Sequence, residues 1–211
     1  MAKGEFKLKD VEVLDIISLR CKGRTFAEIA EVYSVSPSSI LKKINREKVR
    51  PIILARDLLK RYRVIEAPVN VLDIARSEGY CLEGINLPKG ITGYFESKTI
   101  RFNTDISESE KRYAIAKQMG HDALKHMLYE KKKIITKNTI CKIEEISDVE
   151  SWQEMVANKF AMELLVPEKQ LMKTIKKYDY LSFEEVYEIA RKFKVSDVII
   201  SFKLSSLGYE I

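Results

Sequence analysis

The sequence predicts a mostly α-helical protein with one small β-sheet, an α+β fold. Apolar residues recur at helical spacing along most of the 211 residues, which indicates amphipathic helices packed around a core. Three short runs rich in β-branched and aromatic residues, separated by Gly, Pro and Ser-Lys turns, predict the sheet. These runs are 80–83, 91–95 and 99–103.

The first three predicted helices have the order of a helix-turn-helix. They cover Val11–Cys21, 26–33 and 38–47. Thr25 and Glu28 predict a capping box at the start of the second helix, and Ser36 with Pro37 supplies a cap and a first-turn proline to the third. A break at Ser34 separates the two. In a helix-turn-helix, this third helix enters the major groove of DNA.

The charge distribution favours double-stranded DNA as a partner. Up to residue 65 the chain has 15 Lys and Arg against eight Asp and Glu, and the remainder has 22 against 23. The net charge of +6 is therefore concentrated at the N-terminus, as in proteins that bind a polyanion. The expected DNA-binding residues of the third helix are Ser38, Ser39, Lys42, Lys43 and Arg46. A three-helix bundle with a solvated basic face and no DNA role is the alternative.

The rest of the chain continues with helices around the small sheet. The predicted helices are 52–62, one from Ala67 to Gly79, 108 to about 129, 148–165, 168–177, 183–193 and 196–207. Ser107 opens the long one. Residues 131–147 have no clean period, so we expect either a mobile loop or a plain solvated connection. Trp152 and Phe160 are expected in the core.

One helix carries a degenerate catalytic motif, Lys117-Gln118-Met119-Gly120-His121. In His-Glu-x-x-His, two histidines on one helix face bind Zn²⁺, and the Glu takes a proton from the metal-bound water. Lys117 has no lone pair to give while it is protonated, and Gln118 cannot accept a proton. His126 follows His121 by five residues, on another face of a continuous helix, and is a poor substitute ligand.

A later segment completes a known pattern. Residues 154–167 read Glu-x-x-x-Asn-x-Phe-Ala-x-x-Leu-Leu-x-Pro, and 90–93, 100–103 and 112–116 match the Gly-containing hairpin, the strand and the helix lead-in of the same pattern. The chain thereby resembles the ImmA/IrrE family of phage- and stress-associated metallopeptidases. The resemblance implies a zincin-like domain over 49–211, here called the body, after a helix-turn-helix over 1–48, here called the head.

The resemblance also assigns positions in the motif. His121 matches the second zinc ligand and Glu154 the third, whereas Lys117 and Gln118 match the first ligand and the catalytic Glu. Without a metal, Glu154 would be a partly desolvated carboxylate that lacks a counter-charge. Since Lys117 lies one turn from His121 on the same face, we expect its ammonium to pair with Glu154. A solvent-facing lysine is the alternative.

These observations predict a DNA-binding regulator of phage, mobile-element or stress type. Its body would have lost hydrolysis and would bind a protein partner, such as a helix-turn-helix repressor or a second copy of the chain. No cofactor is expected. One alternative is an active zinc-dependent endopeptidase that cleaves a repressor, and another is an antirepressor that acts by protein binding only. Three cysteines without a metal-ligand spacing, each expected to be buried, and no long apolar run indicate a cytoplasmic protein without a membrane contact.

Overall fold

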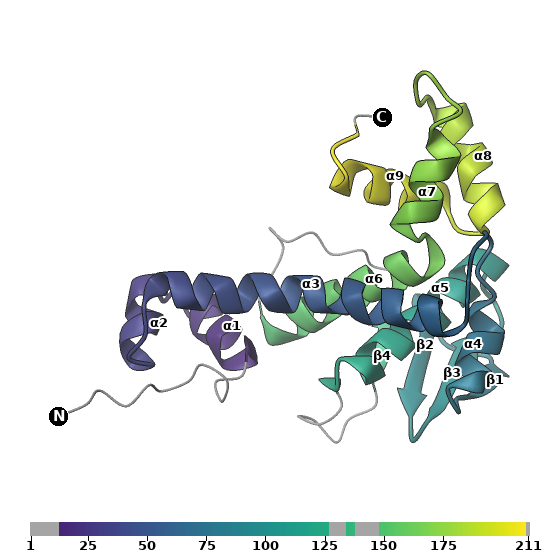
Figure 1. Cartoon of the computed structure of the whole chain (residues 1–211). Coiled ribbons are helices and arrows are strands. Elements are labelled where there is room, and N and C mark those ends of the chain that lie inside the picture. Colours follow the sequence, from purple (N-terminus) through teal and green to yellow (C-terminus); the bar gives the residue numbers. More distant parts are fainter. Residues whose placement is uncertain (1–12, 127–133, 138–147, 210–211) are drawn as a thin grey trace.

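The structure is a computed structural model that describes residues 13–126, 134–137 and 148–209, and for 134–137 only the backbone. It has the α+β fold that the sequence predicts. The described helices are α1 (Val13–Cys21), α2 (Phe26–Val32), α3 (Pro37–Arg61), α4 (Val71–Ser77), α5 (Glu108–Ala123), α6 (Val149–Leu165), α7 (Glu168–Ile175), α8 (Phe183–Phe193) and α9 (Asp197–Ser206). The strands are β1 (Cys81–Ile85), β2 (Ile91–Glu96), β3 (Thr99–Asn103) and β4 (Ile134–Lys137). In Figure 1 the head lies at the left end of α3, and the sheet and α7–α9 lie at the right.

The helix starts in the head are those that the sequence predicts. The Thr25 hydroxyl accepts from the Glu28 amide, and the Glu28 carboxylate accepts from the Thr25 amide at 2.7 Å, which completes the capping box. Ser36 caps α3, whose first residue is Pro37. Between α2 and α3, Ser34 has a φ of +52°, the left-handed conformation that lets the chain reverse in a short turn.

The third helix is longer than predicted. Separate helices over 38–47 and 52–62 were expected, but α3 runs through Pro51 as one helix of 25 residues, and the head–body boundary after residue 48 falls within it. An interior Pro costs about 3 kcal/mol. Ile40 and Ile44 are buried in the head, while Leu58 and Leu59 are buried in the body. Each such side chain contributes roughly 1.5–3 kcal/mol on burial, so the continuous helix is favoured despite the proline.

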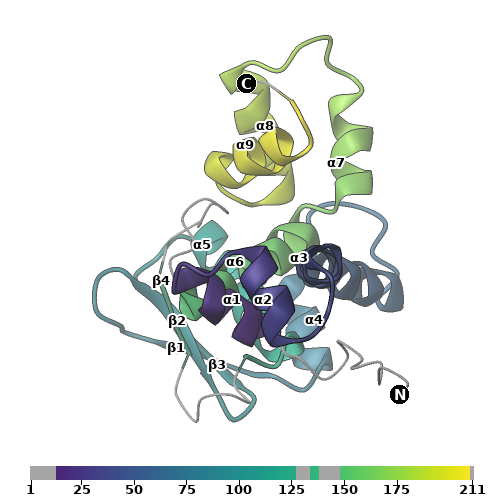
Figure 2. The ribbon, with the colours of Figure 1, turned by 90° about the vertical axis from the view of Figure 1, so that its left-hand side faces the viewer.

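The head shares its core with the body. Its buried cluster contains Ile16, Ile17, Ile29, Ala30, Ile40 and Ile44 together with Trp152, Met155 and Val156 of α6. Figure 2, viewed from the head side, shows α1, α2 and α3 in front of α6. Ala30 of α2 is 2% exposed within this cluster, and its small side chain leaves room for α3 to pack closely against α2. Trp152 is only 2% exposed, which confirms its predicted place in the core.

The sheet has four strands in the order β1-β3-β2-β4. β1 runs parallel to β3, while β2 is antiparallel to both β3 and β4. The expectation of an unstructured connection over 131–147 is therefore wrong for 134–137, and the rest of that segment lies outside the described residues. A Cβ at Gly93 would lie 2.7 Å from the Arg101 carbonyl oxygen, so the close approach of β2 and β3 requires glycine there.

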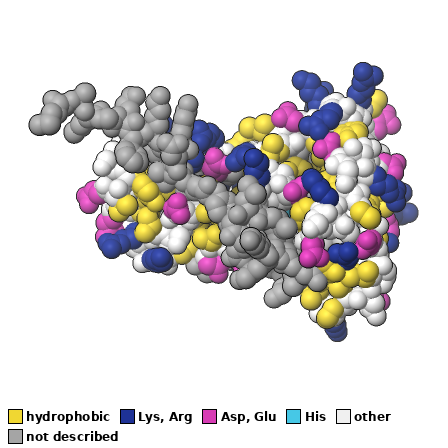
Figure 3. All heavy atoms as spheres, turned by 90° about the horizontal axis from the view of Figure 1, so that it is seen from below, with side chains coloured by type: hydrophobic (Ala, Val, Ile, Leu, Met, Phe, Trp, Pro, Cys, Tyr) yellow, Lys and Arg dark blue, Asp and Glu magenta, His cyan; other side chains and the backbone are white. Residues whose placement is uncertain are grey.

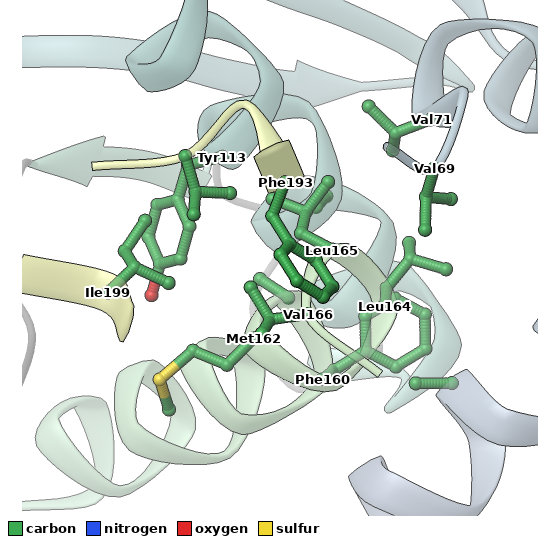
Figure 4. Packing of buried hydrophobic residues seen from close by; sticks show 14 of the residues in the cluster. Val69, Val71, Tyr113, Phe160, Met162, Leu164, Leu165, Val166, Phe193 and Ile199 are labelled. Carbon is green, nitrogen blue, oxygen red and sulfur yellow. The ribbon is translucent and has the colours of Figure 1, made fainter. Parts of the chain in front are cut away.

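The main core lies between the sheet and helices α3 to α9. Figure 4 shows part of it, with Phe160, Leu164 and Leu165 of α6 and Phe193 of α8. α5 ends at Ala123, earlier than the predicted 129. No helix in the described part of the chain is both long and apolar enough to span a bilayer. Cys21 and Cys81 are exposed rather than buried as expected, and Cys141 lies outside the described residues.

Candidate functional site

The degenerate motif lies where α5 and α6 cross at close range. A Cβ on Gly120 would meet the Phe160 ring at 3.0 Å and the Ala157 carbonyl oxygen at 3.1 Å, so this glycine lets the two helices touch. A hydrogen bond of 3.0 Å from the Tyr113 hydroxyl to the Asn158 side chain also joins the helices. Their packing places the motif on α5 opposite Glu154 on α6.

Lys117 and Glu154 form an ion pair at the centre of this crossing. The Lys117 Nζ lies 2.6 Å from Glu154 Oε2, and the lysine side chain is 1% exposed. This contact confirms the predicted pairing and excludes the solvent-facing alternative for Lys117. A pair at this depth stabilises the fold only while both partners are present, since either charge alone would be left desolvated.

Two histidines extend the cluster. His121 Nε2 lies 3.1 Å from Glu154 Oε1, a close contact that lacks the alignment of a good hydrogen bond. On its other side, His121 Nδ1 lies 2.9 Å from Nδ1 of His126. The predicted place of His126 on a different face of a longer helix is wrong, because α5 ends at Ala123 and the following turn brings His126 back to His121.

The cluster combines an ionised carboxylate with neutral imidazoles. Burial by itself raises the pKa of Glu154, but contact with His121 and the charge of Lys117 outweigh it and lower the pKa to about 2. Burial lowers the pKa of His121, and the Glu154 contact only partly offsets this. Burial and the neighbouring His121 lower the pKa of His126 to about 3. At neutral pH the charges of the site are thus those of Lys117 and Glu154.

These residues do not fit a zinc ion. A catalytic zinc needs three protein ligands beside its water. His121 and Glu154 offer two, and the third position holds an ammonium that has no lone pair and lies in contact with the same carboxylate. Within residues 13–126 and 148–209, no three His, Cys, Asp or Glu side chains are grouped so as to hold a metal ion.

The structure divides the predicted DNA-binding residues into two sets. Ser38, Lys42 and Arg46 are exposed on α3. Ser39 and Lys43 are partly buried, and the Ser39 amide and hydroxyl both contact the Ser36 hydroxyl that caps the helix. Ser39 is therefore better explained as part of the helix cap than as a DNA contact.

One charged cluster was missed by sequence reasoning. Glu163 on α6 is 2% exposed and accepts from Arg56 of α3 at 2.7 Å and from Lys203 of α9 at 2.5 Å. The available signal was its place in an apolar helical run, where a carboxylate must find a cation. The partners could not be named because they lie 107 and 40 residues away. The cluster connects α3, α6 and α9, and none of its three residues is a sequence neighbour of Lys117.

Comparisons with known proteins agree with this fold. A family model described as the IrrE N-terminal-like domain matches residues 82–205. Among solved structures, the chain is similar to a Mycobacterium tuberculosis transcriptional regulator, with a TM-score of 0.55 and 15% identity over 76% of this chain and 48% of that one. The chain thus spans about half the length of that regulator, and a likeness at this identity indicates the fold alone. No curated protein matches the sequence.

Proposed function

Because the chain belongs to the family of IrrE N-terminal-like domains, we propose that it is a cytoplasmic, DNA-binding transcriptional regulator with a non-hydrolytic body. The head binds duplex DNA. The body keeps the architecture of its relatives and binds a regulatory protein, for which a helix-turn-helix repressor and a second copy of the chain are the candidates. Such a protein fits a phage, mobile-element or stress circuit.

The ion pair between Lys117 and Glu154 is the main support for a body that does not hydrolyse peptides. Hydrolysis in this architecture depends on a metal-bound water and a carboxylate base. The ammonium of Lys117 neutralises the ligand carboxylate, and Gln118 stands at the position of the base. The site is thereby stabilised without a metal, and the helices α5 and α6 stay in place as a scaffold for binding.

The surface of α3 supports the proposal for the head. Lys42 and Arg46 are exposed on its first three turns, and Lys42 has no ion-pair partner among the described residues. On the face shown in Figure 3, basic and acidic side chains are interspersed over the body. The N-terminal excess of positive charge is thus available for phosphates.

A metal analysis tests the body. Protein purified without chelator should contain far less than one zinc per chain and should not cleave helix-turn-helix repressors. The double variant Lys117→His, Gln118→Glu restores the complete motif and serves as the control, which we expect to bind zinc close to one per chain. One tightly held zinc in the unaltered protein, with a peptidase activity that His121→Ala abolishes, would establish the alternative of an active endopeptidase.

Salt-dependent DNA binding tests the head in the full chain. Lys42→Ala with Arg46→Ala should weaken binding and reduce the slope of log affinity against log salt by about one for each lost phosphate contact. The matched control is Lys176→Ala with Arg191→Ala, which removes the same charge from exposed sites in the body. Equal losses in both variants, or no duplex binding at all, would favour the antirepressor that acts by protein binding only.

A further inference from the structure

On the outward face of α3, few side chains are free to contact the bases of DNA. At about 100° per residue, Ser38, Leu41, Lys42 and Asn45 fall within an arc of about 100° on the first turns of the helix. The buried Ile40 and Ile44 occupy the opposite side, against the rest of the head. The arc therefore points away from the protein, at the end of the molecule that lies farthest left in Figure 1.

Most polar side chains on or beside this arc already have partners. The Ser38 hydroxyl shares a hydrogen bond of 2.8 Å with Ser36. Arg46 and Arg50 both lie near the Glu47 carboxylate, at 3.6 and 3.2 Å. Lys42 and Asn45 are the exposed polar residues of the arc whose side chains have no partner within the described part of the chain.

Asn45 has the chemistry of a base reader. Its amide offers a donor and an acceptor side by side, the pattern that matches N6 and N7 of adenine in the major groove. Lys42 offers donors only and acts as a point charge, so it suits phosphates and discriminates less. Of the two, Asn45 is the residue that can distinguish one base pair from another.

Leu41 adds an apolar contact next to Asn45. The two residues are four apart, so their side chains are neighbours on the helix surface. Leu41 is 41% exposed, so it stabilises the fold less than a fully buried leucine would. In the major groove, the apolar group available to it is the C5 methyl of thymine.

We propose that Asn45 and Leu41 form the base-reading element of the head, with Asn45 bound to an adenine and Leu41 against the methyl group of a thymine. The operator then contains an A·T-rich step at the position of α3. Lys42 positions the helix through phosphate without specifying sequence. This inference rests on the proposed DNA-binding function and specifies the ligand of that same surface.

The test uses the full chain and a pool of random duplexes. Selection with the unaltered protein should yield a site with at least one A·T pair whose exchange for G·C lowers affinity by about 5- to 100-fold. Asn45→Ala should lose that discrimination at one position and keep the salt slope. Lys42→Ala should weaken binding to all sequences and reduce the slope by about one.

The thymine contact has its own test. Replacing thymine by uracil removes only the C5 methyl, so it should weaken binding of the unaltered protein but not of Leu41→Ala.

Unchanged thermal unfolding confirms that these exposed substitutions leave the fold intact, and Asn45→Ser is a second variant if Asn45→Ala unfolds. Sequence preferences that are the same in Asn45→Ala, or an unaltered protein that binds duplexes without preference, would overturn the inference and leave DNA binding standing. A complete lack of duplex binding would instead reject the proposed function.

Discussion

At the residue scale, a single ammonium contacts the carboxylate that the ImmA/IrrE resemblance assigns as a zinc ligand. In a zinc site the metal keeps the ligand carboxylate ionised, and here Lys117 does so at 2.6 Å. The low pKa of Glu154, about 2, follows mainly from two close partners that overcome its burial. The two charges depend on each other, which makes the pair testable by a double-mutant cycle.

Lys117→Met should destabilise the protein by about 3–5 kcal/mol, because it leaves Glu154 partly buried without a counter-charge. Combining it with Glu154→Leu should recover most of that loss. Urea unfolding of the two single variants and the double variant measures the coupling. Lys111→Met is the control on the same helix, since its ion-pair partner Glu108 is 61% exposed and the pair contributes at most about 1 kcal/mol. Additive losses in the cycle would contradict the coupling.

The two histidines predict a loss of stability in weak acid. Burial lowers the pKa of both in the folded chain, to about 3 for His126, whereas the unfolded chain takes up protons near pH 6.5. The stability of the fold is therefore unaffected by the two histidines above about pH 6.5. Below that pH the free energy of unfolding falls by up to about 1.4 kcal/mol per pH unit for each histidine. The low pKa of Glu154 contributes stability above about pH 4.5 that is lost only as the pH falls toward 2.

Urea unfolding between pH 7.5 and 5 measures this dependence. The chain has only two histidines, so His126→Gln should reduce the slope by about half. Within the described part of the chain, the charged and titratable groups that act on His126 are His121, Glu154 and Arg50. Stability that stays constant from pH 7.5 to 5 would show that the imidazoles are not neutral in the folded protein.

At the element scale, α6 serves the head and the body at once. Trp152, Met155 and Val156 complete the core of the head, Glu154 meets Lys117, and Glu163 meets Arg56 and Lys203. A helix with this many partners cannot move without affecting α3. Under the proposed function, the body thereby helps to hold the exposed face of α3 in position.

Trp152→Ala should destabilise the chain by about 3–5 kcal/mol, through the cavity left among the isoleucines of the head. It should also weaken DNA binding, although Trp152 lies 91 residues beyond the end of α3 in sequence. Unfolding and duplex binding of the full chain check both effects. Tyr187→Ala removes an aromatic ring that is 60% exposed and should change neither property by more than a small amount. DNA binding that survives unchanged in Trp152→Ala would show that the head holds its own core.

At the scale of the whole molecule, the head and the body share two helices. α3 is continuous from the caps at Ser36 to the core around Leu59, and α6 packs against both ends. The exposure of Trp152, Met155 and Val156 on loss of the head would place a large apolar surface in water. The two parts should consequently unfold together.

Calorimetry of the full chain should give one transition, with equal calorimetric and van't Hoff enthalpies. Residues 1–50 alone should be largely unfolded, because their buried side chains lack the α6 surface. Circular dichroism of that fragment provides the second measurement. Two separate transitions, or a fragment with native helix content, would mean that the shared core contributes little.

Much of the local structure could be predicted from the sequence. The capping box of α2, the start of α3 at Ser36 and Pro37, and the bounds of α6 and α8 within one residue were predicted correctly, because they depend on side chains that lie close together in the chain. That Gln118 and Lys117 cannot act as the base and the first zinc ligand stays a prediction, which rests on the chemistry of these two side chains alone. The resemblance to ImmA/IrrE metallopeptidases was confirmed by the family match over 82–205.

Only the tertiary structure decided the features that depend on contacts between distant segments of the chain. α3 continues through Pro51 because both of its ends are buried by different parts of the fold, and β4 exists because β2 offers an open edge. His126 reaches His121 because α5 stops early, and Glu163 is tolerated because Arg56 and Lys203 converge on it. Local propensity amounts to less than about 1 kcal/mol per residue, or about 3 kcal/mol at an interior proline. Burial of several large apolar side chains contributes about 1.5–3 kcal/mol for each, and a buried charge without its partner costs several kcal/mol, so long-range packing prevails where the two disagree.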